Sequence, residues 1–457
     1  MTIISKFKKK FYFVAAGYFK FFANISLKKW HPRIVIITGS AGKTTMLNLV
    51  ESQLGAKAHY SHNANSAFGI AFDILGMRGI TGSKLKWIKL IIKTPFRAFT
   101  YQHRQPFYIV ECDGERPHEA EFIAKWLKPE VSCWVSLGRS HAVFFENEVK
   151  SGRFANIDEA IAHEFSTIPA NTKKLVLIDD ESKKMHECTE GLKAKVVPVN
   201  QKDLKNYEVY PDKAIFDFGK HKFQFNEPMP RDVTVQLLML GELMEYLGEK
   251  INYTLDDFKM PPARCNYLRG KKGITIIDSS YNAHIISMTT VLDMVKVLKA
   301  DRKWLVIGDI IDQGQLEGEE HKKLAKLLLD TKVQNIVMIG RRTKKYTYPL
   351  LKDKVKNVHS FDKPQQALKY LEENLTGKET VIFKGSQYLE WIVEKLLEDP
   401  RDVEKLARQD EAHRRRRASW GLEWCKSYIL FMVGLTNQNL GMKLLSISKN
   451  AALRQNY

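Results

Sequence analysis

The chain has 457 residues, of which 44% are hydrophobic and 27% are charged, and its formal net charge is +20. This length suffices for two or three cored domains, and the composition excludes a disordered chain. The positive charge predicts anionic partners such as nucleotide phosphates, a phospholipid surface or nucleic acid. The cysteines lie far apart without a Cys-x-x-Cys pair, which argues against a disulfide framework or a zinc site and fits a reducing compartment.

Residues 1–32 form a basic, aromatic-rich segment that precedes the first predicted strand. Its apolar side chains recur at helical spacing, namely Phe7, Phe11, Val14, Tyr18, Phe21 and Ile25. Two interpretations fit this pattern: residues 1–28 lie as an amphipathic helix on an anionic membrane, or the helix docks on the protein's own core. The sequence contains no run of about 20 apolar residues, so no membrane span is predicted. No small-residue cleavage site follows the segment, which disfavours a secretory signal.

The segment from Ile34 to Thr45 is the most informative motif. A β-branched run predicts a buried strand, and a helix is expected from Met46 to Leu54. The turn between them consists of Gly39, Ser40, Ala41, Gly42, Lys43, Thr44 and Thr45. Such a turn directs backbone N–H groups and a helix N-terminus at one point, which is an arrangement that holds phosphate.

Two side chains of this turn carry specific expectations. Lys43 would reach the outer phosphates of a nucleotide, and the Thr44 hydroxyl would ligate Mg²⁺. The motif is a short form of the phosphate-binding loop, because Ile37 stands where the longer pattern has glycine. The alternative is an ordinary turn between a strand and a helix.

Two α/β domains are predicted downstream of the N-terminal segment. Residues 33–262 form the first, with a mostly parallel sheet whose further strands are predicted at 107–111, 131–136 and 174–179. Residues 82–105 interrupt it with a basic amphipathic segment, either a lid or a second membrane-facing patch. Pro261-Pro262 marks the boundary to a smaller Rossmann-like domain over residues 263–400, with strands predicted at 273–278, 303–308, 335–340 and 380–384. Residues 401–457 are a basic tail, expected to be a surface appendage without chemistry of its own.

Several short motifs follow one another in a set order. They are Asn63-Ala-Asn65 with Gly69, Glu111-Cys-Asp-Gly114 with Pro117, His141, Arg264, Asp278-Ser-Ser-Tyr-Asn-Ala283, Gly308-Asp309 with Gly314 and His321, and Phe383-Lys-Gly-Ser386. Over roughly residues 33–398 this order resembles the Mur ligases, the ATP-dependent amide-bond-forming enzymes of cell-wall precursor synthesis. The resemblance implies ATP and Mg²⁺ as cofactors and an acyl-phosphate intermediate that an amine then attacks.

The resemblance also implies roles for individual residues. Catalytic roles fall on Lys43, Glu111 and His141, and metal-binding roles on Thr44, Glu111 and His141. Nucleotide binding falls on the loop from Gly39 to Thr45 and on Arg264 and Asp278, and the amine substrate would face Asn282, Lys384 and Ser386. Structural alternatives are that Glu111 caps a helix, His141 is an ordinary loop histidine, Arg264 forms an interface ion pair and Lys384 is solvated.

The sequence departs from the family pattern in three places. Only 32 residues precede the first predicted strand, so the family's N-terminal UDP-sugar-binding domain is expected to be missing and a UDP-linked substrate is in doubt. Phe165 aligns with the family's carbamylated, metal-bridging lysine, and the neighbouring Glu164 is not an automatic replacement because adjacent helical residues diverge by about 100°. The family's paired asparagines near adenine align with a segment that contains Asp232 and Gln236, either of which could hydrogen-bond a base.

The combined prediction is an ATP-dependent carboxylate–amine ligase of small-molecule or peptide substrates, placed in the cytoplasm on the inner face of the membrane. One alternative is a ligase on an acceptor outside the cell wall. Another is a non-catalytic, nucleotide-binding partner protein at the membrane, which Phe165 and the expected missing domain motivate. Nucleic-acid binding is disfavoured, because the basic residues accompany apolar faces instead of stacking aromatics. The oligomeric state is not predicted.

Overall fold

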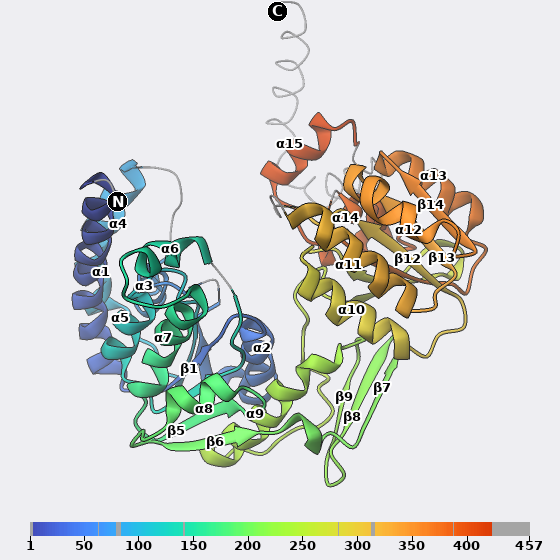
Figure 1. Cartoon of the computed structure of the whole chain (residues 1–457). Helices are drawn as coiled ribbons and strands as arrows, with labels where there is room; N and C mark the ends of the chain where they lie inside the picture. Colours follow the sequence, from blue (N-terminus) through green and yellow to red (C-terminus); the bar gives the residue numbers. More distant parts are fainter. Residues whose placement is uncertain are drawn as a thin grey trace, which may run out of the picture. The chain divides into compact units, whose positions relative to one another are not determined.

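The computed structural model describes residues 3–62, 64–78, 84–139, 142–281, 283–311, 316–386 and 388–422. The chain folds into two compact units (Figure 1). The first contains residues up to 207 together with 215–225 and 232–259. The second contains residues 208–214, 226–231 and the described chain from 260 onward.

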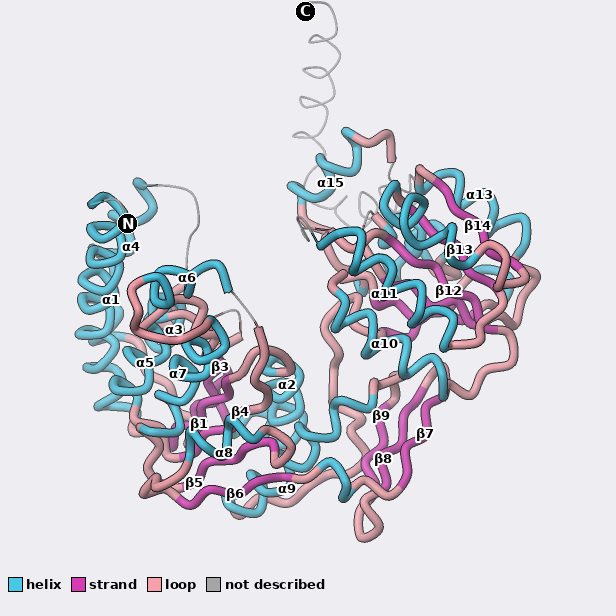
Figure 2. Tube along the Cα trace, viewed as in Figure 1, coloured by secondary structure: helices cyan, strands magenta, loops and turns pink. Residues whose placement is uncertain are grey.

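The first unit is built on a six-stranded parallel sheet in the order β2-β3-β1-β4-β5-β6. Figure 2 shows strands of this sheet in magenta among the helices. The strands are β1 (Arg33–Thr38), β2 (Ala58–Tyr60), β3 (Phe107–Cys112), β4 (Val131–Trp134), β5 (Leu175–Asp179) and β6 (Lys195–Val199). β1 is central, with Ile36 paired to Val110 on one side and to Ser132 on the other. Its apolar residues are buried because a parallel sheet is covered on both faces.

The helices of this unit connect and cover the strands. They are α1 (Ile3–Trp30), α2 (Lys43–Leu54), α3 (Ala67–Ile74), α4 (Lys84–Thr100), α5 (Glu119–Leu127), α6 (Ala142–Lys150), α7 (Ile157–Ala170), α8 (Lys183–Thr189) and α9 (Thr234–Leu247). The prediction of an α/β unit with a parallel sheet is confirmed, and the predicted strands occur within one or two residues of their expected positions.

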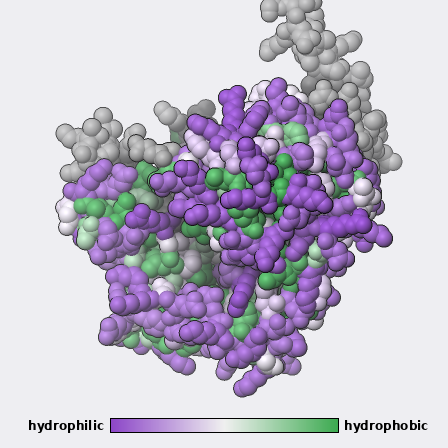
Figure 3. All heavy atoms as spheres, turned by 45° about the vertical axis from the view of Figure 1, so that its right-hand side comes forward, coloured by the Kyte–Doolittle hydropathy of each residue, from purple (hydrophilic) through white to green (hydrophobic). Residues whose placement is uncertain are grey.

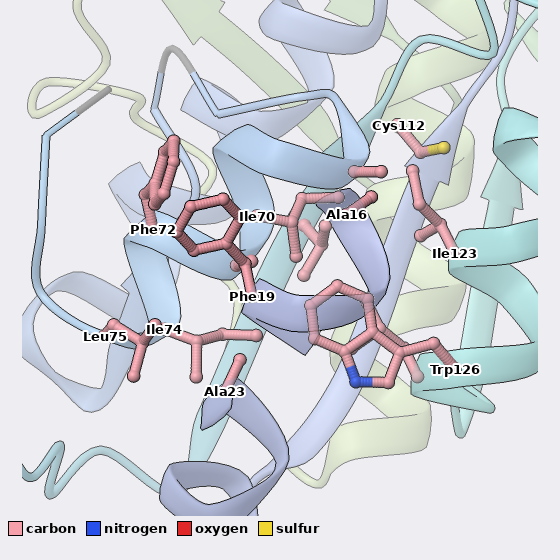
Figure 4. Close-up of a cluster of buried hydrophobic side chains, with 14 of the residues drawn as sticks. Ala16, Phe19, Ala23, Ile70, Phe72, Ile74, Leu75, Cys112, Ile123 and Trp126 are labelled. Atoms are coloured by element: carbon pink, nitrogen blue, oxygen red, sulfur yellow. The ribbon is translucent and has the colours of Figure 1, made fainter. Parts of the chain in front are cut away.

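Helix α1 packs on the core of the first unit (Figure 4). Ala16, Phe19 and Ala23 are buried at spacings of three and four residues, and they contact the same cluster as Ile70 and Trp126. Of the two interpretations of the N-terminal segment, docking on the protein's own core therefore holds for this face of the helix. Among the described residues, none of the helices has both the length and the apolar character needed to cross a membrane.

A three-stranded sheet links the two units along the sequence. Its strands are β7 (Asn206–Tyr210), β8 (Lys213–Asp217) and β9 (Lys222–Phe225), in that order. Within the second unit, Val209 forms a parallel bridge with Leu298, and Lys299 N donates to Val209 O at 2.9 Å. Residues from two short internal segments thus belong to the second unit although most of that unit lies later in the chain.

The second unit contains a six-stranded mixed sheet in the order β10-β11-β15-β12-β13-β14. The strands are β10 (Asn266–Arg269), β11 (Thr275–Ser279), β12 (Lys303–Gly308), β13 (Asn335–Ile339), β14 (Asn357–Phe361) and β15 (Thr380–Lys384), and β10 alone runs antiparallel to its neighbour. The helices are α10 (Ile285–Val297), α11 (Glu317–Asp330), α12 (Tyr348–Leu351), α13 (Pro364–Asn374), α14 (Leu389–Leu396) and α15 (Glu411–Ser419). This arrangement confirms the predicted second α/β fold.

The first part of the basic tail is integrated into the second unit. Arg417 is only 1% exposed and forms an ion pair with Glu394 at 2.9 Å. Leu406 and Leu422 belong to the hydrophobic cluster beneath. The prediction of a surface appendage is therefore wrong for the tail up to residue 422, because a buried guanidinium pairs with a carboxylate on α14. The later residues lie outside the described part of the chain.

The surface is mostly hydrophilic in the view of Figure 3, with separate hydrophobic areas among charged and polar residues. This distribution is ordinary for a protein with 27% charged residues.

Two phenylalanines of α1 that are two residues apart test the docking of this helix. Phe19 is 2% exposed and Phe21 is 63% exposed. Phe19→Ala should lower the free energy of unfolding by about 3 kcal/mol, because it leaves a cavity in the core. Phe21→Ala should change it by less than about 0.5 kcal/mol. Urea denaturation followed by circular dichroism measures both, and equal losses in the two variants would contradict the observed orientation of α1.

Candidate functional site

The turn between β1 and α2 is a tight bend that requires glycine at two positions. Gly39 and Gly42 have φ angles of 137° and 78°, which side chains disfavour. A Cβ atom on Gly39 would also lie 2.7 Å from the carbonyl oxygen of Ser136. Helix α2 begins at Lys43, three residues before the predicted start, and no side chain caps it. The first N–H groups of α2 therefore face the bend without a capping side chain, as anion binding requires.

Hydrogen bonds to the segment after β4 fix this bend. The Ser136 hydroxyl accepts from Ala41 N and donates to Ala41 O, both at 2.8 Å. Ser40 Oγ donates to Gly138 O at 2.6 Å and accepts from Gly138 N at 2.8 Å. The loop conformation is thus held by backbone and hydroxyl groups of a neighbouring strand end.

Lys43 is buried inside the bend, where its positive charge is paired with a carboxylate. Its side chain is 9% exposed, and Nζ lies 2.8 Å from Asp113 Oδ1 and donates to Gly39 O at 2.6 Å. Asn65 in turn donates to the Asp113 carboxylate, while Asp113 N donates to Asn65 O at 3.2 Å. Asp113 was not among the predicted site residues. Its place two residues after Glu111, beyond the carboxyl end of β3, is the sequence signal that could have found it.

Thr44 and Glu111 come together across the edge of the sheet. The Thr44 hydroxyl donates to Glu111 Oε1 at 3.2 Å, so this carboxylate faces the first turn of α2. Hydroxyl and carboxylate oxygens are the ligands that Mg²⁺ prefers, and the pair lies beside the phosphate bend, so the residues present fit this ion. Within the described ranges, no cluster of three His, Cys, Asp or Glu side chains is arranged around a metal-sized point. His141, the third predicted metal ligand, lies outside the described residues.

The region of Phe165 is a packed structural element. Phe165 is 1% exposed and belongs to a hydrophobic cluster, so it offers no metal ligand. The adjacent Glu164 accepts from His118 N and Ala120 N, both at 2.7 Å, at the start of α5. Burial raises the pKa of Glu164 to about 7, although these N–H groups oppose the shift. Both oxygens of Glu164 already hold backbone donors, and its role in the structure is to cap α5.

Gln236 supports the phosphate bend. It is 7% exposed, and with its amide nitrogen donating to Asp232 O at 3.0 Å and Val233 O at 3.1 Å, its side chain lies against Gly42. A Cβ atom on Gly42 would come within 2.1 Å of this amide. In this position Gln236 packs on the loop itself, whereas Asp232 is exposed. That either side chain hydrogen-bonds a base stays a prediction.

In the second unit, the carboxyl end of β11 places Asp278 in the interior. Asp278 is fully buried, and its Oδ1 accepts from Ser280 N at 3.0 Å, while Oδ2 has no hydrogen-bond partner among the described residues. Burial raises its pKa to about 6. An orphaned buried carboxylate oxygen has a high energetic cost, which is typical of functional sites.

Lys384 and Ser386 lie at the carboxyl end of β15, the strand next to β11. Lys384 is 3% exposed, and burial lowers its pKa to about 8 although Cys265 and Asp278 favour its charged form. The alternative that Lys384 is solvated is therefore wrong. Ser386 is 6% exposed, and its N–H donates to Asp309 O at 3.3 Å.

The other two predicted residues of this unit differ in outcome. The guanidinium of Arg264 lies 5.0 Å from the centre of the Tyr281 ring, a cation–π contact within the unit. Asn282 lies outside the described residues. The structure thus brings Asp278, Lys384 and Ser386 to one edge of the sheet and places Arg264 beside Tyr281.

Known proteins resemble this chain in sequence. Residues 263–387 match the family described as Mur ligase, glutamate ligase domain. The chain is 22% identical over 397 residues to the UDP-N-acetylmuramoyl-tripeptide–D-alanyl-D-alanine ligase of Bacillus subtilis, which covers 83% of this chain and 79% of that protein. It is 21% identical over 386 residues to the ligase of the same name from Buchnera aphidicola, covering 80% of this chain and 75% of that protein.

Solved structures share the fold. A MurF ligase from Thermotoga maritima in complex with ADP superposes with a TM-score of 0.64 at 18% identity, over 85% of this chain and 84% of that chain. MurF from Acinetobacter baumannii gives a TM-score of 0.60 at 17% identity, over 83% of this chain and 79% of that chain. The sequence match in the second unit and the likeness across both α/β units agree with the motif order. The chain therefore contains a Mur ligase glutamate ligase domain at residues 263–387 and resembles Mur ligases in sequence and fold over about 80% of its length.

Proposed function

We propose that this protein is an ATP-dependent carboxylate–amine ligase that acts on a cell-wall precursor. The observation that carries the proposal is the bend between β1 and α2, where Lys43, Thr44 and Glu111 converge on an uncapped helix N-terminus. The names of the relatives supply the substrate class, a UDP-N-acetylmuramoyl-tripeptide and D-alanyl-D-alanine. We place the activity in the cytoplasm, where ATP is present and the free cysteines remain reduced.

The proposed reaction has two steps. A carboxylate oxygen of the acceptor attacks the γ-phosphorus of ATP, and ADP leaves to give an acyl phosphate. The amine of the second substrate then attacks the acyl carbon, inorganic phosphate leaves, and the amine loses a proton as the amide forms. Phosphoryl transfer depends mainly on positioning and charge neutralisation.

The residues of the first unit would supply these two contributions. The N–H groups from Gly42 to Thr45 would hold the phosphate oxygens, since Ser40 N and Ala41 N already donate to Ser136. Lys43 would exchange its ion pair with Asp113 for a phosphate. Thr44 and Glu111, with His141 as a further candidate, would hold Mg²⁺, which neutralises phosphate charge when it is bound. Gln236 and Ser136 would keep the bend rigid.

In the second unit we propose a substrate-binding role for the strand ends of β11 and β15. Asp278 and Lys384 are buried charges of opposite sign at neighbouring strand ends, and they offer both an acceptor and a donor to a polar ligand. We propose that Lys384, Ser386 and Asn282 face the amine substrate, and that Asp278 and Arg264 serve the nucleotide. The corresponding domains would be residues 33–262 for ATP and residues 263–400 for the amine.

A second candidate is a non-catalytic, nucleotide-binding partner protein. Phe165 favours it, because this buried side chain stands where the family pattern has a metal-bridging lysine and cannot bind Mg²⁺. A ligase that uses an acceptor outside the cell wall is the third. The three candidates share the phosphate bend and differ in turnover.

Removal of Lys43 or Glu111 tests the ligase. ATP consumption that requires both the UDP-linked tripeptide and D-alanyl-D-alanine should fall by about 100-fold or more in Lys43→Ala and Glu111→Ala, since each change removes charge stabilisation from the phosphoryl transfer. Lys125→Ala is the control, because this lysine is 63% exposed and forms its ion pair along α5 with Glu121. Coupled ADP release measures the rate.

The outcome also separates the candidates. Tight ATP binding with no turnover on any carboxylate and amine pair would support the partner protein and refute the ligase. Turnover with other acceptors, and none with the UDP-linked tripeptide, would refute only the cell-wall substrate.

The buried carboxyl of Asp278 predicts a pH dependence of stability. Its folded-state pKa is raised from 3.8 to about 6, so the folded protein retains a proton that the unfolded chain has lost. The stabilisation is present below about pH 4 and is lost as the pH rises through 6, by at most about 3 kcal/mol. Asp278→Asn should remove this decline, while Asp257→Asn, at an exposed aspartate, should retain it. Urea denaturation at several pH values measures it, and parallel curves for wild type and Asp278→Asn would contradict the assignment.

A further inference from the structure

Two helices that are distant in sequence lie side by side at the surface of the first unit (Figure 1). The Tyr18 hydroxyl of α1 donates to Ile91 O of α4 at 2.9 Å. Lys29 Nζ donates to Phe99 O at 3.3 Å, which closes the other end of the pair. These contacts join α1 and α4 into one layer.

Helix α4 carries apolar side chains on two faces. One face is buried and consists of Leu90, Thr94 and Ala98. The other is exposed, with Ile88 at 54%, Ile92 at 72%, Phe96 at 68% and Phe99 at 60%. At about 100° per residue, the four exposed side chains fall within an arc of about 80° that is centred about 150° from the buried face. The core therefore does not account for this outer apolar face.

Helix α1 adds two exposed apolar residues to the same layer. Val14 is 65% exposed and Phe21 is 63% exposed, one heptad apart. In the described part of the chain, twelve large hydrophobic side chains are at least half exposed, and half of these belong to the two helices. We call these six the α1–α4 surface: Val14, Phe21, Ile88, Ile92, Phe96 and Phe99. Such a concentration of apolar residues marks a contact surface.

The charges of the layer all have one sign. Lys28 and Lys29 of α1 and Lys89 and Lys93 of α4 are exposed. Neither helix contains an aspartate or glutamate. Beyond the helices, the sequence has no acidic residue from position 1 to 50 or from 74 to 110. An apolar face on two helices whose only charged side chains are basic is complementary to a surface that is apolar inside and anionic at its rim.

We propose that the α1–α4 surface docks the protein on an anionic lipid bilayer. The exposed isoleucines and phenylalanines insert at the level of the headgroups, and the lysines bind lipid phosphates. A second copy of the chain fits less well, because a two-fold contact of this surface would bring the lysines of both copies together. The proposal concerns where the protein is located and is independent of its catalytic activity.

Vesicle sedimentation of the full-length protein tests this proposal. Wild type should pellet with vesicles of phosphatidylcholine and phosphatidylglycerol, less with phosphatidylcholine alone, and less as NaCl is raised. Ile92→Ser with Phe96→Ser should lower the partition coefficient by at least about tenfold, since each side chain loses its apolar contact. The matched control is Ile286→Ser with Val297→Ser on α10, which removes two apolar side chains that are also more than half exposed and should leave binding unchanged.

A charge variant gives an independent arm. Lys89→Gln with Lys93→Gln should weaken binding to anionic vesicles by about fivefold for each lysine and leave the weak binding to neutral vesicles as it is. Lys322→Gln with Lys326→Gln, an exposed pair at the same spacing on α11, is the control. Retained ATP binding shows that each variant is folded.

Two results would overturn the proposal. One is equal pelleting of wild type and the Ile92→Ser, Phe96→Ser variant. The other is a wild-type protein that does not bind vesicles and is a dimer in analytical ultracentrifugation, while the Ile92→Ser, Phe96→Ser variant is a monomer. That result would make a second copy of the chain the partner of this surface. Both results are separable from a failure of the ligase assay, because no turnover is measured here.

Discussion

The double hydrogen bond between Ser136 and Ala41 is the interaction on which the candidate site depends. It ties the turn after β1 to the segment after β4, its neighbour in the sheet. Ser40 N and Ala41 N donate to Ser136 and hold the turn in place, and the first N–H groups of α2 follow it without a capping side chain. The turn leads directly into α2, whose first two residues are Lys43 and Thr44. The position of Lys43 and the approach of Thr44 to Glu111 therefore follow from the conformation of the turn. A chain with the same residues and a loose turn would lack this convergence.

Much of the sheet could be predicted from the sequence, because strands buried on both faces are apolar along their whole length and rich in β-branched residues. Ile34 to Ile37 and Val381 to Phe383 are such runs, and they form strands. The short strand β2 and the order of strands were not predicted, since pairing depends on contacts between distant segments. The start of α2 was placed too late for a different reason. Glycine and lysine do not by themselves show where a helix starts, and only the backbone geometry shows that α2 already begins at Lys43.

The candidate site was predictable where a residue type has one chemical use and less so where it has several. The phosphate bend required glycines, a lysine and a threonine in order, and the structure brings them together. Asp113 was missed because an aspartate after a strand has many structural uses, and only its 2.8 Å distance to Lys43 distinguishes it. Arg417 is the reverse case. A run of four arginines predicts solvent exposure, yet one of them is buried against Glu394 where the helix faces the core.

The path of the chain between its two units has a practical consequence. Residues 208–214 and 226–231 belong to the second unit, although the first unit resumes after each of them. No single cut in the polypeptide therefore separates the two units intact. A fragment that begins at residue 260 would lack the segment around Val209 that bridges to Leu298, and a fragment that ends there would carry that segment without its packing partner. Either fragment expressed alone should therefore lack the contact between Val209 and Leu298. Functional work is best done with the whole chain.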